Sequence, residues 1–153
     1  MLAEWAEALR DTADWGWVVD ASWRLRFVTN EQRLSFAAGV EMVPIVIGEH
    51  MFGSGMVEVS ADWRTGPKVA KSWRELFANV GGLVLADTPG GRAELQSLVD
   101  PSLAEVVDGL TPSSASVIAG SQAATGTTAR AESVLLKALR IRDADGQLRG
   151  TAI

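Results

Sequence analysis

The single histidine has more possible chemical roles than any other residue in this sequence. His50 lies in the segment GEHMFG (residues 48–53), and its imidazole could serve as an axial ligand of haem. The other interpretation is a hydrogen-bonded or surface histidine without a ligand. The 153 residues contain one His and no Cys. These counts exclude a multi-histidine metal site within one chain, a disulfide, a thiol nucleophile and a zinc finger, so we expect no metal site.

The other residue patterns that could bind a nucleotide or catalyse a reaction are weak. The GSG segment (residues 53–55) lacks the third glycine of a dinucleotide-binding fingerprint, and residues 120–128 lack the lysine of a P-loop. Asp143 and Asp145 are explained as turn residues. A Ser-His-Asp triad would need His50, and no nucleophile-elbow motif is present. The sequence therefore predicts a domain that is not an enzyme by itself.

Charge and hydropathy exclude two further classes of partner. The chain has 14 Lys+Arg against 19 Asp+Glu, which argues against binding to a phosphate backbone. No window approaches the roughly 18 uninterrupted apolar residues of a membrane span. The N-terminus also lacks the basic and apolar regions of a signal peptide. We therefore predict a cytoplasmic protein with no nucleic-acid partner and no membrane span.

The first segment, residues 1–14, is predicted to carry an amphipathic helix over residues 1–12. Leu2, Trp5 and Leu9 recur at spacings of three and four residues, so they share one face of that helix. This face packs either on its own domain or on a partner subunit.

A β-hairpin is predicted after this helix. Residues 15–20 form its first strand, residues 20–23 the turn and residues 24–29 the second strand. Strict alternation would place Leu25 and Phe27 on the same, buried side of the second strand.

A short helix should follow the hairpin. Thr29 and Gln32 have the spacing of a capping box, which predicts a helix through Phe36 that ends near Gly39. Residues 40–60 are expected to be irregular.

The strongest helical pattern lies in the middle of the chain. Residues 67–79 combine a proline in the first turn with an apolar stripe, and Gly81 and Gly82 are expected to end this helix. Residues 83–86 could form a short strand or continue the buried segment. Two short helices, over 92–99 and 102–109, are predicted next.

The last third of the chain reads as strands. Residues 116–123 and 133–142 are predicted strands, although a helix over 129–140 is a rival. The turn at 143–146 favours the strands, with Asp145 and Gly146 as a pair of residues of positive φ, and residues 147–153 pair back. In the second strand, the residues expected to share a face are Leu135, Leu139 and Ile141.

The order of elements predicts an α+β fold. The N-terminal hairpin and the C-terminal strands join one sheet, and the middle helices cover one face of it. Because the last strand is barely complete at residue 153, we expect a fragment of a longer protein.

Two segments resemble the ends of a PAS domain. The segment WVVDASWRLRFVTNE (residues 17–31) resembles the opening hairpin of that family, and LRIRDADGQLRGTAI (residues 139–153) resembles its closing hairpin. The phrase DTPGGR (residues 87–92), taken with these ends, is similar to N-terminal sensor segments of actinobacterial class III adenylate/guanylate cyclases.

This resemblance implies a fold and a role for residues 15–153. It implies a PAS-like sensor domain with a five-stranded antiparallel sheet, a pocket between the sheet and the helices, and homodimers formed through an N-terminal helix. It also implies a covalently linked C-terminal output domain, such as a nucleotide cyclase, that the domain would regulate.

The resemblance also implies where a ligand would bind. A flavin or coumaric-acid photosensor of the usual kind would need a cysteine, so we expect a small, fatty-acid-like apolar molecule, with haem on His50 as an alternative. The candidate pocket residues are Trp73, Leu76, Phe77, His50, Met51 and Phe52. The candidate dimer interface is Leu2, Trp5 and Leu9. The rival function is a ligand-free dimerisation or protein-interaction module, which a filled core would favour.

Overall fold

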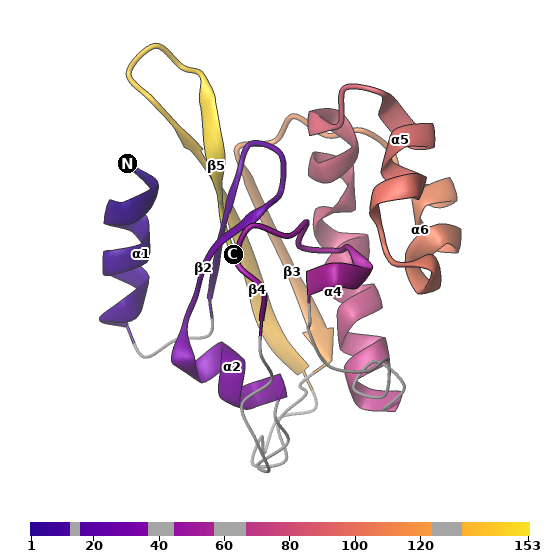
Figure 1. Ribbon diagram of the computed structural model, residues 1–153, viewed down its shortest axis with the longest axis horizontal. Helices are drawn as coiled ribbons and strands as arrows, with labels where there is room; N and C mark the ends of the chain where they lie inside the picture. Colours follow the sequence, from indigo (N-terminus) through magenta and orange to yellow (C-terminus); the bar gives the residue numbers. More distant parts are fainter. Residues whose placement is uncertain (13–15, 37–44, 57–66, 124–132) are drawn as a thin grey trace.

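Five antiparallel strands form one sheet in the computed structural model, which describes residues 1–12, 16–36, 45–56, 67–123 and 133–153 (Figure 1). The strand order is β2-β1-β5-β4-β3. The predicted α+β class and the five-stranded antiparallel sheet are therefore confirmed. The strands are β1 (Trp17–Asp20), β2 (Leu25–Val28), β3 (Val117–Ala123), β4 (Ser133–Arg142) and β5 (Leu148–Ala152).

The predicted hairpin forms, but with a bulge in its second strand. Val18 lies opposite Phe27 and Val19 opposite Leu25, so one extra residue is inserted into β2 between them. Leu25 consequently faces the main core, while Phe27 packs on the opposite side of the sheet. The prediction that these two side chains share a face is wrong, because the bulge interrupts the alternation of the strand.

The turn between β1 and β2 holds a tryptophan in an unusual conformation. Trp23 has a φ of 59°, in the left-handed region that favours glycine. The carboxylate of Asp20 supports the turn, because its Oδ1 accepts hydrogen bonds from the backbone N–H groups of Ser22 (2.9 Å) and Arg24 (3.0 Å). Trp23 itself is buried in the core.

A capped helix, α2 (Asn30–Phe36), follows β2 as predicted. The Oγ1 atom of Thr29 accepts a hydrogen bond from the Gln32 N–H at 3.2 Å, which is the N-cap contact that the sequence indicates. The predicted stop at Gly39 lies outside the described residues. Of the stretch expected to be irregular, residues 45–56 contain turns and the 3₁₀ helix η1 (Ser54–Met56).

The central helix, α4 (Pro67–Asp87), is eight residues longer than predicted, because it continues past Asn79 to Asp87. Gly81 and Gly82 do not end it. A Cβ at Gly82 would lie 2.6 Å from the carbonyl oxygen of Thr111, whereas Ser113 donates its N–H to the Gly82 oxygen at 2.8 Å. The glycines therefore serve close packing: they let residues 110–113 cross the helix surface.

The predicted pair of short helices is confirmed, with a break at the proline. These helices are α5 (Gly91–Leu98) and α6 (Ala104–Gly109), separated by the 3₁₀ helix η2 (Pro101–Leu103). The carboxylate of Asp100 caps η2 by accepting from the Ser102 N–H at 3.0 Å. Its other oxygen accepts from the Ser54 hydroxyl at 2.9 Å, which ties η1 to η2.

The C-terminal strands form as predicted, and β4 has the predicted bounds. The rival helix is therefore wrong over residues 133–140. In the turn between β4 and β5, Gly146 has a φ of 77°, but Asp145 does not have a positive φ. The predicted pair of positive-φ residues is corrected to one, because the loop closes through Asp143, whose N–H donates to the Gln147 oxygen at 3.0 Å.

The helices flank the sheet on both faces. Figure 1 shows the helix α1 (Leu2–Arg10) on one side of the sheet and α4 on the other, with α5 and α6 outside α4. The larger hydrophobic cluster lies between the sheet and the middle helices. The smaller one lies under α1, on what we call the outer face of the sheet. No helix in the described ranges is long and apolar enough to cross a membrane.

Candidate functional site

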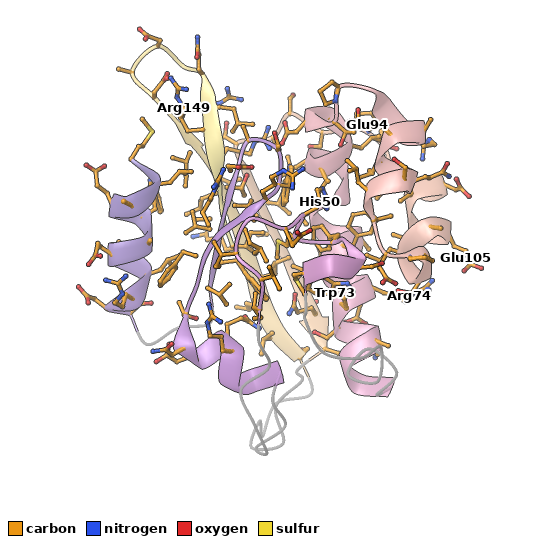
Figure 2. All side chains as sticks on the ribbon, in the orientation of Figure 1. His50, Trp73, Arg74, Glu94, Glu105 and Arg149 are labelled. Carbon is orange, nitrogen blue, oxygen red and sulfur yellow. The ribbon has the colours of Figure 1, made fainter. Side chains whose placement is uncertain are left out.

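The predicted pocket residues meet in an aromatic cluster centred on Phe52. The Phe52 ring lies 4.7 Å from the Phe77 ring, 5.1 Å from Trp73, 6.2 Å from Trp23 and 6.5 Å from His50, measured between centroids. All of the ring pairs are tilted, the arrangement that aromatic rings prefer in cores. Figure 2 shows His50 and Trp73 on the side of the sheet that faces α4.

This cluster is packed against itself. Phe52, Phe77 and Met51 are fully buried, and Trp73 is nearly so. Of the six predicted pocket residues, Leu76 is the one that lines the hollow described below. The side chains that the sequence nominates for ligand binding therefore occupy the space between α4 and the sheet.

His50 is buried beside the hairpin. Its side chain is 7% exposed, and its Nδ1 accepts a hydrogen bond from the Phe52 N–H at 3.3 Å. Burial lowers the pKa of His50 from 6.5 to about 4, because the imidazolium loses its hydration. The Arg24 guanidinium lowers the pKa further, and Asp20 partly opposes this effect.

The described contacts of His50 are those of a core residue. One ring nitrogen already accepts from the local backbone, and the ring is packed on Phe52 rather than on the open hollow. The geometry favours the other interpretation from the sequence, a hydrogen-bonded core histidine that is neutral at physiological pH.

The lowered pKa predicts a specific dependence of stability on pH. The unfolded chain binds a proton at His50 near pH 6.5, and the folded chain only near pH 4. The free energy of unfolding should therefore fall by about 3 kcal/mol as the pH drops through this window, and the loss should level off below it.

Urea unfolding at about pH 7 and about pH 4.5 can test this expectation. The variant His50→Gln keeps a hydrogen-bond acceptor but does not titrate, so it should lose clearly less stability between the two conditions. The contribution of the carboxyl groups cancels in the difference between the two chains. An equal loss in both chains would contradict a buried neutral histidine.

A buried ion pair joins α4 to the sheet. The guanidinium of Arg140 bonds both carboxylate oxygens of Asp87, and the Trp23 indole Nε1 donates to the same carboxylate at 2.8 Å. The side chains of Arg140 and Asp87 are 4% and 9% exposed. The Nε of Arg140 is buried without a hydrogen-bond partner among the residues that the structure describes. This contact joins three separate segments at one point.

Two residues of the DTPGGR segment thus have structural roles. Asp87 holds Arg140, and the Arg92 guanidinium donates to the carbonyl oxygens of Val107 and of Leu110, the latter at 2.8 Å. The second contact covers carbonyl groups at the end of α6.

The predicted interface residues of α1 pack on their own domain. Leu2, Trp5 and Leu9 are partly buried over Val18 and Ile141, on the outer face of the sheet. The face shared by these residues is confirmed. This contact accounts for the amphipathic pattern without a partner.

The other half of the outer face carries no helix in the described part of the chain. Leu135 of β4 is 93% exposed, and Val117 of β3 is 50% exposed. Leu139 lies directly opposite Val117 and is partly buried. Leu135, Leu139 and Ile141 do alternate onto one face, but α1 covers only the Ile141 end. The alternation of these residues in the sequence predicts an apolar face on β4. It does not predict which part of that face α1 covers.

A hollow of about 530 Å³ adjoins this bare half-face. Trp5 and Leu9 of α1, Trp17 of β1 and Leu76 of α4 line it, together with residues 134–137 of β4. Gln122 also lines it, and its buried Oε1 has no hydrogen-bond partner among the described residues. The sequence does not predict this site, because the hollow depends on how α1 and α4 pack on strands from both ends of the chain.

No protein-family model, no curated protein and no solved structure matches the chain. The described residues contain no group of three or more His, Asp or Glu side chains that could hold a metal ion.

Proposed function

We propose that this chain is a PAS-like regulatory domain that acts through its outer sheet face as a homodimerising module. The observation that carries the proposal is Leu135, which is 93% exposed on a face whose other half is covered by α1. Exposed apolar surface of this kind is typical of a protein–protein contact. The surface is Leu135, Leu139 and Val117, bordered by Trp5 and Leu9 of α1.

The regulatory role follows from the resemblance of the two hairpins to PAS domains. In this proposal, the packing of two outer faces has more than one arrangement, and a signal shifts the population between them. A linked output domain, such as a nucleotide cyclase, would respond to that shift. The filled aromatic cluster around Phe52 favours this module over a sensor with an interior ligand. The interior ligand stays a prediction from the resemblance.

Comparing the native mass of the purified chain with its denatured mass tests this function. We expect twice the chain mass under native conditions. The variant Leu135→Glu should yield the single-chain mass, because a carboxylate would be buried at the contact. Leu135 is a cleaner site than Leu9, because Leu9 also packs on its own sheet.

The matched control is Glu105→Lys, a charge change on α6, on the far side of the sheet from the outer face (Figure 2). It should leave the native mass unchanged. A single-chain mass for the unmodified protein would contradict the dimer. Additional mass released on denaturation would support the apolar-ligand prediction instead, and its value would separate haem from a lipid.

A further inference from the structure

Strand β3 is the edge of the sheet that the described residues leave open. The opposite edge, β2, is closed by residues 48–51: the Leu25 N–H donates to the Glu49 oxygen at 2.9 Å, and the Met51 N–H donates to the Trp23 oxygen at 2.8 Å. β3 pairs with β4 on one side, and no strand in the described ranges pairs with its other side (Figure 1). A strand from outside can therefore add to the described sheet at β3.

Alternate backbone groups of β3 point away from β4. The Arg140 N–H donates to the Ser116 oxygen at 2.9 Å, so the backbone groups of Ser116 face β4. Because the direction alternates along a strand, the N–H and C=O groups of Val117 and Ala119 face the open edge. No described residue makes a hydrogen bond with these four groups. Both residues are exposed, so the start of β3 presents two donors and two acceptors to a partner strand.

Helix α4 closes the other end of this edge. The Asn79 Nδ2 donates to the Ser121 oxygen at 2.9 Å, and a carboxylate oxygen of Glu75 accepts from the Ala123 N–H at 2.5 Å. A Cβ at Gly120 would collide with the Asn79 amide, so α4 lies directly on β3 at this point. Side chains of α4 thus occupy the edge at the end of β3, and the open part is limited to the start of the strand.

The open stretch lacks the features that protect strand edges from pairing. Natural edge strands carry charged side chains, prolines or bulges that prevent the addition of another strand. β3 has the sequence VIAGSQA, with no charged residue and no proline, and its pairing with β4 has no shift of register. An unprotected edge of this kind is the surface to which an extended peptide adds in β-strand addition.

The position of α4 decides between a second copy and a single strand. The open edge of a second copy, within the described ranges, is also β3, and antiparallel strands joined at that edge present their helix-covered faces on the same side. The two α4 helices would then lie about one strand spacing apart, about 4.8 Å, whereas packed helices need roughly 8–10 Å. A folded second copy cannot pair here, but an extended segment without a helix of its own can.

We propose that the start of β3 is a docking site for an extended segment of a partner protein, antiparallel to β3. Two residues of the segment exchange backbone hydrogen bonds with Val117 and with Ala119, which satisfies all four open groups. The residue opposite Val117 is apolar, because the Val117 side chain is 50% exposed on the same, outer face. The residue opposite Ala119 is acidic, because of the lysine described next.

Lys137 supplies the charge preference of this site. It lies directly opposite Ala119 on β4 and is exposed, and the ion pairs of the described residues give it no carboxylate partner. The docked residue opposite Ala119 is two strand spacings, about 10 Å, from the Lys137 backbone, on the same face of the sheet. The small Ala119 side chain between them leaves room for the long lysine stem to reach a carboxylate on the docked segment.

Hydrogen exchange measured residue by residue tests this site. The probe is the peptide Gly-Glu-Val-Val-Thr with acetyl and amide caps, in which the glycine leaves room for Asn79, the glutamate lies opposite Ala119 and the second valine lies opposite Val117. The exchange of the Val117 and Ala119 amides should slow about twofold when the peptide concentration equals its Kd, and further above it. The amides of Ile118 and Gly120, which face β4, should change little.

Two matched controls test the backbone bonds and the charge separately. The peptide Gly-Glu-Val-Pro-Thr, with the same caps, lacks one N–H at the edge and should slow neither amide. The variant Lys137→Glu should bind the glutamate peptide more weakly and should prefer Gly-Lys-Val-Val-Thr. Equal slowing by the proline peptide would overturn pairing through the backbone. An unchanged preference for glutamate in Lys137→Glu would overturn the acidic partner.

Three other results would overturn the proposal as a whole. The first is no slowing at peptide concentrations up to about 10 mM. The second is protection of Val117 and Ala119 in the chain alone that disappears on dilution, which would assign the edge to a second copy. The third is protection that persists on dilution, which would assign the edge to another segment of the same chain.

The docking site and the proposed dimer can fail separately. The dimer is tested by the native mass of the unmodified chain and of Leu135→Glu, and neither measurement involves the peptide. The peptide titration is repeated on Leu135→Glu, which should have the single-chain mass. The same slowing at Val117 and Ala119 is expected there, because the edge of β3 and the outer face of the sheet are different surfaces.

Discussion

Replacing Arg140 with methionine is expected to lower the free energy of unfolding by about 3–5 kcal/mol, one of the two largest effects that we predict for a single substitution. The substitution keeps most of the side-chain volume but leaves the Asp87 carboxylate buried with the Trp23 indole as its remaining side-chain donor. An uncompensated buried charge is far more costly than the loss of the ion pair itself. Urea unfolding of Arg140→Met and the unmodified chain measures the difference.

Two further variants separate the buried charge from the ion pair. Lys71→Met removes a cation from an exposed pair with Glu75, 3.7 Å apart, and should change stability by less than about 1 kcal/mol. The double variant Asp87→Leu with Arg140→Met removes both charges and should recover most of the loss. Recovery is favoured because the native pair leaves the Arg140 Nε without a partner in the described part of the chain. A double variant as unstable as Arg140→Met would contradict this explanation.

This ion pair also shows why the sequence could not predict the whole fold. Asp87 and Arg140 are 53 positions apart, and no local pattern links them. Trp23 poses the same problem, because a tryptophan with a φ of 59° contradicts the residue preferences of turns. Its indole bond to Asp87 and its burial offset this local strain. Contacts between distant segments therefore override local preference at this turn.

Local patterns were sufficient where one physical rule dominates. The bounds of β4 were predicted correctly because its alternating apolar residues lead into a tight turn. The N-cap at Thr29 was predicted because a side-chain oxygen can satisfy a free N–H at the start of any helix. The face formed by Leu2, Trp5 and Leu9 was predicted from helical periodicity, although not the surface that it covers.

Local patterns are ambiguous where a residue type has two uses. Glycine ends helices, but it also allows close packing, and only the position of residues 110–113 shows which use applies at Gly82. An aromatic stripe can line a pocket or fill a core, and the rings around Phe52 fill the core. The hollow beside β4 depends on strand pairing, which a single sequence does not specify.

Replacing Phe52 with alanine is the second variant for which we expect a loss of about 3–5 kcal/mol in the free energy of unfolding. The ring is fully buried and touches aromatic rings from α4 and from the β1–β2 turn. The variant removes these contacts and leaves a cavity that the surrounding rings cannot fill. The control is Ile47→Ala, outside the proposed contact surface, which should change stability far less, because Ile47 is 47% exposed.

The response of Phe52→Ala to a small apolar molecule then separates the two functions. A closed apolar cavity made by truncation can bind benzene, so benzene should restore part of the lost stability of the variant. Benzene should not stabilise the unmodified chain through this cluster, because the Phe52 ring already occupies the space. If Phe52→Ala instead costs less than about 1 kcal/mol, and the unmodified chain is stabilised equally by benzene, then the space beside α4 is already open. That result would favour a sensor domain with an interior ligand. It would contradict the filled core on which the proposal of an interaction module rests.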